Sequence, residues 1–220
     1  MKIFVSLLPC LIVVVFCIGC SDDPPVPEPK PTIQQIFPMK VGDIWVYQRN
    51  TIQTGTVDSS TYRFVSTDSS LINSRTYTLE IDGDTTKSGG LYFVGTSDLY
   101  SVSFSKGITT MKHLLQYPME FDNNVLLDYH IRASDFMRIR EDLILRQDTT
   151  TVATPLGTFH CVYFENVSYM GPTDSFQDTT GIVGLYYAKN IGLVKREEYD
   201  YVSGKRVLNR TLQLVSYSLK

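Results

Sequence analysis

The sequence predicts an all-β protein, or a β-rich α+β protein with one short helix, built as a single curved antiparallel sheet in the form of a half-barrel or open barrel. Tyr and Phe number 14 and 11 among 220 residues, whereas Ala occurs only as Ala133, Ala153 and Ala188. Aromatic and β-branched side chains suit a pleated, half-buried surface, and a helical protein would contain more Ala. Alternating apolar and polar residues, separated by turn residues, indicate the same class.

The alternation is clearest over residues 76–81, where Tyr77, Leu79 and Ile81 share one face of an expected strand. Residues 62–64, 137–147 and 159–169 show the same pattern. Short connections between such strands are typical of meanders, sandwiches and barrels rather than of parallel βαβ units. Turn residues occupy the intervals, at Asp82-Gly83-Asp84, Ser88-Gly89-Gly90, Thr154-Pro155-Leu156-Gly157, Gly171-Pro172 and Ser203-Gly204.

Two features of the middle of the chain are ambiguous. Residues 108–117 carry Met111, Leu114 and Leu115 at helical spacing before Pro118, which predicts the short helix, laid across the sheet. Residues 123–135 fit a helix and a strand equally well.

The segment Phe37–Met39 (Phe-Pro-Met) also recurs as Tyr117–Met119 (Tyr-Pro-Met), which indicates either two related halves or a chance match.

The N-terminus has the features of a secretory signal peptide, covering residues 1–19. Lys2 supplies the positive charge, and an apolar run from Ile3 to Ile18 ends at the small residue Gly19. A membrane-spanning helix needs ~20 apolar residues, and this run is shorter and contains Pro9. We therefore expect export followed by cleavage.

The tetrapeptide Cys17-Ile18-Gly19-Cys20 resembles the lipobox of bacterial lipoproteins, although the family usually has Leu where this chain has Cys17. The resemblance implies that Cys20 is lipidated, with palmitate among its acyl chains, and becomes the new N-terminus. Ordinary secretion with an unmodified Cys20 is the alternative. The segment 21–23 (Ser-Asp-Asp) resembles the acidic export tag of surface lipoproteins of Bacteroidota, and a plain acidic spacer fits equally well.

These features predict a protein of the bacterial cell envelope, anchored in the outer membrane through Cys20, on its periplasmic side or on the cell surface. Residues 20–32 form the lipidated cysteine and a tether whose five prolines favour an extended chain. The antiparallel β domain is expected to span residues 33–220. Cys10 and Cys17 leave with the signal peptide, so Cys161 remains as the free thiol of the domain and forms no internal disulfide.

Further motifs resemble a broad set of bacterial lipoproteins and secreted proteins that have no established activity. They are Phe37-Pro38 followed by Val41–Tyr47, then Thr154–Cys161 and Ile191–Glu197. The resemblance implies a β-sheet envelope protein and brings no catalytic residues.

The same motifs also have a structural interpretation. Pro155 and Gly157 predict a hairpin that directs Phe159 and Cys161 inward. Gly192 is expected where the backbone approaches an aromatic side chain.

Several chemistries find no support in the sequence. A net charge of -3 argues against a nucleic-acid partner. We expect no metal and no cofactor: His113, His130 and His160 are far apart in sequence, and His160 points to the opposite face of its strand from Cys161. The segment 82–84 lacks the later glycine and glutamate of a calcium loop, which favours a hairpin turn.

We also expect no catalytic residues. The chain contains no Gly-x-Ser-x-Gly, and residues 103–106 (Ser-Phe-Ser-Lys) have Ser-x-x-Lys spacing at the end of a strand rather than at the start of a helix. Cys161 is expected in the core. Trp45 and the tyrosines are core residues or line a sugar or lipid site. The spatial pairing of the carboxylates is open: Glu141, Asp142, Glu165, Glu197 and Glu198.

The functional expectation is non-enzymatic binding of a lipid, a glycan or an envelope protein on a concave, aromatic-rich sheet. One alternative is a structural or protein-interaction module without a small-molecule ligand, whose sheet is filled by its own side chains. Another is a hydrolase in which two carboxylates face each other across a cleft. The ligand-binding residues are not identified at this level.

The lipobox assignment can be tested by the substitution Cys20→Ser. Without the sulfur that carries the lipid, the exported protein should leave the membrane fraction. Fractionation of cells followed by immunoblotting measures this. Membrane retention of the variant, with the signal peptide intact, would show that the assignment is wrong.

Overall fold

The computed structural model describes residues 29–68, 75–85, 90–94, 96–105, 108–132, 137–172 and 178–220. The signal peptide, Cys20 and the first part of the tether lie outside the described residues, as do Ser88-Gly89, Lys106 and residues 133–135. No helix in the described part is long and apolar enough to cross a membrane.

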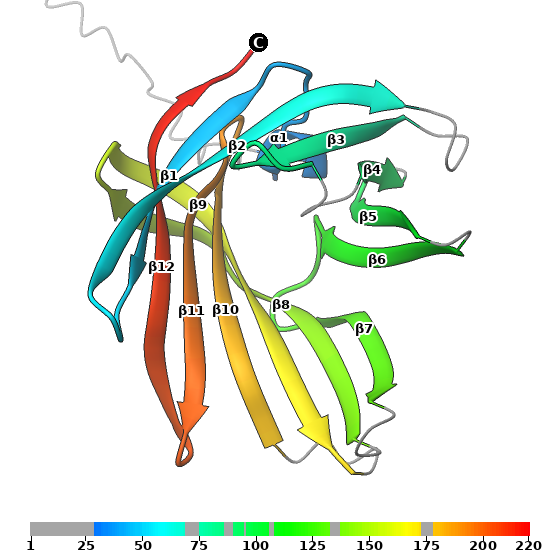
Figure 1. The fold of residues 1–220 in the computed structure, drawn as a ribbon, viewed down its shortest axis with the longest axis vertical. Helices are drawn as coiled ribbons and strands as arrows, with labels where there is room; N and C mark the ends of the chain where they lie inside the picture. Colours follow the sequence, from blue (N-terminus) through cyan, green and yellow to red (C-terminus); the bar gives the residue numbers. More distant parts are fainter. Residues whose placement is uncertain are drawn as a thin grey trace, which may run out of the picture.

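The described residues form one antiparallel sheet of twelve strands and one short helix, which confirms the predicted fold class (Figure 1). The sheet order is β6-β5-β4-β3-β2-β1-β12-β11-β10-β9-β8-β7. The elements are α1 (Ile33–Ile36), β1 (Ile44–Thr51), β2 (Thr56–Asp68), β3 (Thr76–Ile81), β4 (Gly90–Val94), β5 (Asp98–Ser105), β6 (Ile108–Gln116), β7 (Asn124–Arg132), β8 (Met137–Thr154), β9 (Gly157–Gly171), β10 (Asp178–Ala188), β11 (Gly192–Val202) and β12 (Lys205–Ser218).

The sheet curls into a barrel that is nearly closed. Every paired neighbour is also a neighbour in sequence except β1 and β12, which join the two ends of the chain. The two edges of the sheet are β6 and β7. Lys112 of β6 spans this seam, since its Nζ lies 2.8 Å from Glu141 Oε2 and 3.9 Å from Asp128 Oδ2. Glu141 and Asp128 oppose each other in the β7–β8 pair, so the ammonium group also relieves their repulsion.

The short helix lies elsewhere than predicted. Residues 108–116 form β6, and residues 124–132 of the second ambiguous segment form β7. The prediction of a helix over residues 108–117 was wrong. Met111, one of the three apolar residues at helical spacing, is 54% exposed and does not belong to a buried face. Pairing of β6 with β5 overrides the local pattern.

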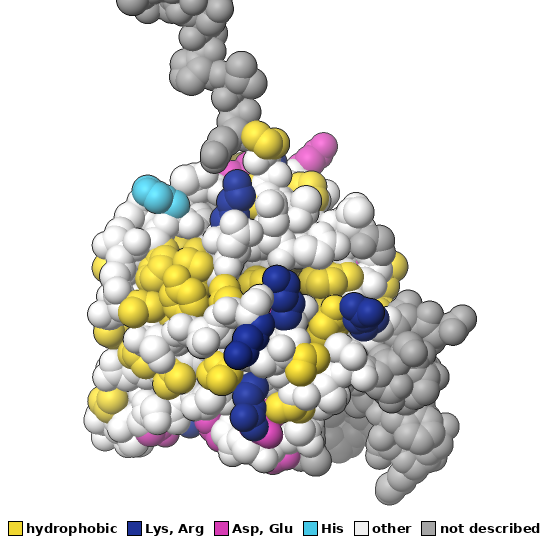
Figure 2. All heavy atoms as spheres, turned by 90° about the horizontal axis from the view of Figure 1, so that it is seen from above, with side chains coloured by type: hydrophobic (Ala, Val, Ile, Leu, Met, Phe, Trp, Pro, Cys, Tyr) yellow, Lys and Arg dark blue, Asp and Glu magenta, His cyan; other side chains and the backbone are white. Residues whose placement is uncertain are grey.

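Helix α1 closes one end of the barrel. Thr32 N–H donates to Gln35 Oε1 at 2.9 Å at the start of the helix, and Ile33 and Ile36 are fully buried. The β10–β11 turn is tied to the helix by the Asn190 N–H, which donates to the Gln35 carbonyl at 2.5 Å. Figure 2 looks onto this end and shows a continuous surface on which hydrophobic and basic side chains are interspersed.

The two faces of the sheet are packed differently. The concave face, around α1, carries the main core, which includes Tyr47, Leu212 and Leu214. The convex face carries a small cluster around Ile144, whose other members are Val167, Ile182, Tyr169 and Tyr199. No second layer of strands or helices in the described structure covers this cluster (Figure 1).

Polar and aromatic side chains cover the convex cluster instead. The guanidinium group of Arg206 lies 3.8 Å from the ring centre of Tyr199 and forms an ion pair with Glu165 at 2.6 Å. The stem of an arginine shields apolar surface while its charged end stays hydrated. Residues of the sheet itself therefore protect its outer face.

The turns and the sequence repeat fit this architecture. Asp82 and Gly83 form the predicted hairpin turn, with positive φ angles of 54° and 80°. Thr154 opposes Gly157 in the second predicted hairpin. The two Pro-Met segments at 37–39 and 117–119 precede β1 and β7, the first strands of two consecutive runs of six.

A core substitution tests which face is the interior. Leu214 is fully buried on the concave face, and Leu214→Ala should lower the free energy of unfolding by ~2–5 kcal/mol. Leu126→Ala, at a side chain that is 51% exposed, should change it by less than ~0.5 kcal/mol. Urea denaturation of the Cys20→Ser protein measures both. Equal effects would contradict the assignment of the interior.

Candidate ligand-binding site

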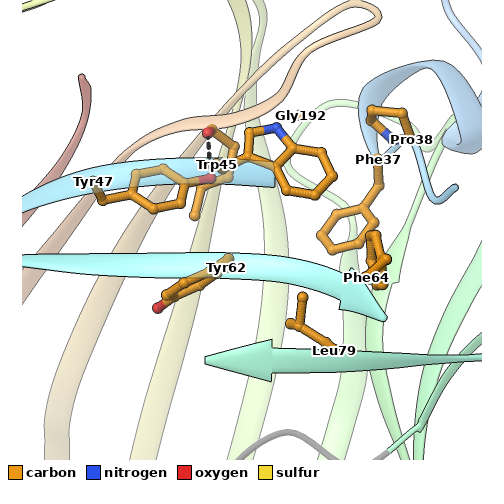
Figure 3. Close-up of a pocket in the computed structure, with 9 residues that line it drawn as sticks. Phe37, Pro38, Trp45, Tyr47, Tyr62, Phe64, Leu79 and Gly192 are labelled. Carbon is orange, nitrogen blue, oxygen red and sulfur yellow. Dashed lines mark hydrogen bonds between the residues drawn. The ribbon is translucent and has the colours of Figure 1, made fainter. Parts of the chain in front are cut away.

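A small apolar cavity lies inside the barrel, next to α1. Its volume is about 90 Å³. Figure 3 shows aromatic rings from β1 and β2 around it, with Leu79 of β3 on one side and Gly192 on another. The complete lining is Phe37, Pro38, Trp45, Tyr47, Tyr62, Phe64, Leu79, Gly192 and Leu193.

Hydrogen bonds to the backbone hold two of the aromatic walls in place. Trp45 Nε1 donates to the Ile191 carbonyl at 2.6 Å. The Tyr47 hydroxyl donates to the Leu193 carbonyl at 2.8 Å, the bond drawn as a dashed line in Figure 3. The Trp45 ring meets Phe64 edge to face at a centroid distance of 5.6 Å. With their polar atoms engaged, Trp45 and Tyr47 leave apolar ring surface to line the cavity.

Gly192 permits the close approach of β11 to this wall, as the sequence predicted. Its φ is +100°, and a Cβ atom would lie 3.5 Å from both Pro38 Cδ and Trp45 Nε1. Any other residue would be strained in this conformation. Gly192 therefore serves packing and also lines the cavity.

Beyond the cavity the concave face carries charged side chains, three of which are arginines. Directly opposed residues of an antiparallel pair point to the same face, and Leu212, part of the concave core, opposes Arg49 on one side and Arg196 on the other. Arg49 is two residues from Tyr47, a distance of ~7 Å along the strand. Arg210 opposes Glu198 in the next row.

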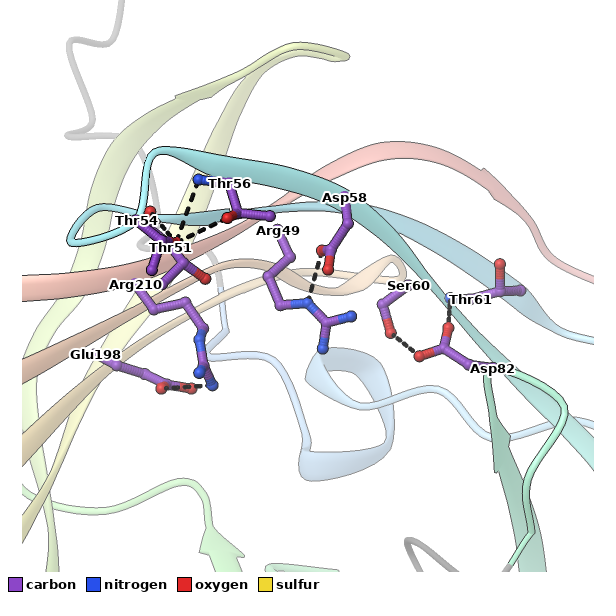
Figure 4. Close-up of polar contacts among 10 residues, drawn as sticks. All are labelled: Arg49, Thr51, Thr54, Thr56, Asp58, Ser60, Thr61, Asp82, Glu198 and Arg210. Carbon is purple, nitrogen blue, oxygen red and sulfur yellow. Dashed lines mark hydrogen bonds and ion pairs between the residues drawn. The ribbon is translucent and has the colours of Figure 1, made fainter.

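Two carboxylates partner these three arginines. Arg49 Nε lies 2.7 Å from Asp58 Oδ1. Glu198 is shared. Its Oε1 lies 3.0 Å from Arg196 Nε. Its Oε2 lies 3.3 Å from Arg210 Nη1, a contact drawn in Figure 4. The arginine side chains are 34–41% exposed, so solvent reaches this part of the barrel.

Tyr62 connects the cavity to the arginines. Its ring lines the cavity and packs on Tyr47 at a centroid distance of 5.0 Å. Burial raises the pKa of the Tyr62 hydroxyl, while the nearby positive charges of Arg196 and Arg49 lower it in part. Tyr62 thus lies between the cavity and the arginines.

Residues 45–208 of this chain match the model of the DUF3108-like family. The chain belongs to the DUF3108-like family. No curated protein matches the sequence.

Two crystal structures of bacterial proteins are similar in fold to this DUF3108-like chain. A protein assigned as a lipoprotein from Parabacteroides distasonis ATCC 8503 is 19% identical, with coverage of 84% of this chain and 98% of the other, and a TM-score of 0.49. A protein assigned as exported, with a YmcC-like fold, from Bacteroides fragilis NCTC 9343 is 17% identical, with coverage of 83% and 98% and a TM-score of 0.45.

The carboxylates singled out in the sequence are held by cations and do not form one group. Glu198 lies on the concave face, whereas Glu165 and Glu197 lie on the convex face. Burial disfavours the charge of Glu165, but hydrogen bonds from Tyr163, Arg206 and Arg146 outweigh it and lower its pKa. The pKa of Glu197 is lowered in the same way, by hydrogen bonds from Lys195, Tyr199 and Tyr186. Glu141 pairs with Lys112, and Asp142 with Arg140.

A second hollow, of about 290 Å³, lies where the tether meets the domain. Cys161 and His160 both line it, although Cys161 is buried and His160 exposed, as their opposite directions predicted. Burial raises the pKa of the Cys161 thiol to about 12, so the residue belongs to the core and is not a thiolate at neutral pH. The other lining residues are Pro31, Asp148, Thr149, Val162, Tyr187 and Lys189.

The remaining histidines also lie apart. His113 stacks on Tyr100 and lies 3.1 Å from Asp98, and the side chain of His130 is outside the described residues. Within the described ranges no three His, Cys, Asp or Glu residues are placed to hold a metal ion.

The sequence left Trp45 open between a core residue and a lining residue, and in the structure it is both buried and part of the cavity wall. The local sequence patterns missed Arg49, Arg196 and Arg210. The alternation around Tyr47 and Arg49 places both on one face of a strand. That Arg196 joins them depends on the β1–β12–β11 register, which no local pattern encodes.

Proposed function

We propose that this protein is a lipid-anchored lipoprotein of the outer membrane that binds a lipid-type ligand non-enzymatically inside its barrel. The observation that carries the proposal is the aromatic cavity, an apolar space inside the concave core that no side chain fills. Whole drug-sized ligands occupy ~300–1,000 Å³, so this cavity suits the end of an acyl chain, whose remainder would extend along the concave face.

The position of the tether is compatible with such a role. The described chain enters the domain at residues 29–32, beside α1 and the closed end of the barrel. An anchor at Cys20 would therefore hold the closed end toward the membrane. The concave face beyond the arginines would remain accessible from the other end.

The alternatives receive less support. A module filled by its own side chains would not leave a cavity among Trp45, Tyr62 and Leu79. A hydrolase with paired carboxylates needs one carboxyl group that retains its proton. The lowered pKa values of Glu165 and Glu197 disfavour that role for either residue.

Trp45 is the only tryptophan of the chain and provides an internal reporter. Titration of the Cys20→Ser protein with ω-bromododecanol, a neutral chain with a heavy atom at its end, should quench Trp45 fluorescence with a saturable isotherm. Leu79→Phe should fill the cavity and weaken binding at least ~10-fold, the equivalent of ~1.4 kcal/mol.

The matched control is Leu156→Phe, the same replacement at a residue that is 41% exposed in a hairpin turn. It should leave the isotherm unchanged. Absence of quenching, or equal binding by both variants, would refute binding in the cavity and favour the interaction module.

A further inference from the structure

The concave face changes character in steps from the closed end of the barrel to the open end. Trp45 and Tyr47 line the apolar cavity, Arg49 follows on the same face of β1, and Thr51 follows Arg49. On β12 the same direction runs through Leu214, Leu212 and Arg210. On both strands an arginine therefore follows the apolar residues, and Arg210, which opposes Thr51, lies one row beyond Arg49, which opposes Leu212.

The three arginines share two ion-pair partners. Asp58 pairs with Arg49, and Glu198 pairs with both Arg196 and Arg210. Two further carboxylates lie nearby and are held by neutral donors. Asp82 accepts hydrogen bonds from Ser60 Oγ at 2.9 Å and from the Thr61 N–H at 2.7 Å (Figure 4). Asp200, two residues from Glu198 on the same face of β11, accepts one from Gln53 Nε2 at 3.5 Å.

Some donor capacity of the arginines is also unused. The Nε atoms of Arg196 and Arg210 are buried, and neither donates a hydrogen bond to any residue that the structure describes. Arg196 Nε is close to Glu198 Oε1, but its N–H does not point at the oxygen, so the contact is an ion pair only. One carboxylate thus serves two guanidinium groups with imperfect geometry.

The convex arginines make an instructive contrast. Arg146 and Arg206 both bind Glu165, at 2.9 and 2.6 Å, and Arg146 also binds Asp122 at 2.6 Å. Their donors are directed into one closed network over the outer cluster. The convex pair is as exposed as the concave arginines and also shares one carboxylate, but it lies over the outer cluster, whereas the concave arginines follow the apolar cavity.

We propose that the barrel binds an anionic amphiphile, whose acyl chain enters the cavity at Trp45 and whose carboxylate or phosphate group lies among Arg49, Arg196 and Arg210. The inference rests on the proposed binding function and specifies its ligand class. Guanidinium groups bind carboxylates and phosphates through paired, charge-assisted hydrogen bonds. Because the existing ion pairs are partly hydrated, sharing or exchanging a partner costs little.

The preference for an anionic head group is tested with four ligands that have the same ω-bromododecyl chain and different head groups. ω-Bromododecanoate, ω-bromododecyl phosphate, ω-bromododecanol and ω-bromododecyl trimethylammonium are titrated against the Cys20→Ser protein, with Trp45 quenching as the readout. At least one anion should bind ~10-fold or more tightly than the alcohol, and the cation least tightly. The anion that binds more tightly shows whether the natural head group is a carboxylate or a phosphate. Added salt should reduce the difference in affinity between the anions and the alcohol.

Single substitutions locate the head group. Arg196→Gln and Arg49→Gln should each weaken anion binding ~10-fold and leave binding of the alcohol unchanged. Arg63→Gln is the matched control, because Arg63 also forms an ion pair, with Glu80 at 2.8 Å, but its odd position on β2 directs it to the convex face. Unchanged thermal denaturation of all three variants confirms that they fold.

Each outcome has a distinct meaning. Equal binding of the anions and the alcohol, or an anion preference that survives both arginine substitutions, would overturn the inference and leave the proposed apolar binding intact. Failure of all four ligands to quench Trp45 would overturn the proposed function as well.

Discussion

The pairing of β1 with β12 is the interaction on which the rest of this structure depends. It joins strands from opposite ends of the domain, with Tyr47 opposite Leu214 and Arg49 opposite Leu212. All other paired strands are neighbours in sequence and need only short connections. The described part of the domain contains no disulfide to reinforce this closure, and its free cysteine, Cys161, is buried. Side-chain packing and the backbone hydrogen bonds between β1 and β12 therefore maintain this closure.

The cavity and the arginine rows exist only because of this closure. β1 contributes Trp45 and Arg49, while β12 and β11 contribute Arg210 and Arg196. A single curved sheet must also bury its concave face without a second layer. The helix residue Ile36 and the aromatic rings do so at one end, whereas toward the other end the face is left to charged and partly hydrated side chains. This incomplete filling is the basis of the proposed binding site.

The sequence predicted what local patterns determine. Alternation identified the strands, the turn at Asp82 and Gly83 formed as expected, and Gly192 lies against Trp45. The segment 108–116 was misassigned because three apolar residues happened to match helical spacing, and its strand state is set by pairing with β5. The convergence of Arg49 with Arg196 depends on long-range register, so neither their charges nor their spacing in the chain revealed it.

The central claim is that one amphiphile spans the aromatic cavity and the arginines. A crystal structure of the Cys20→Ser protein with ω-bromododecanoate tests it most directly, because bromine is located by its anomalous scattering. The account predicts a bromine peak beside Trp45 and a carboxylate within hydrogen-bond distance of Arg49, Arg196 or Arg210. A bromine peak outside the concave face, or a reversed ligand with its carboxylate at the closed end, would contradict it.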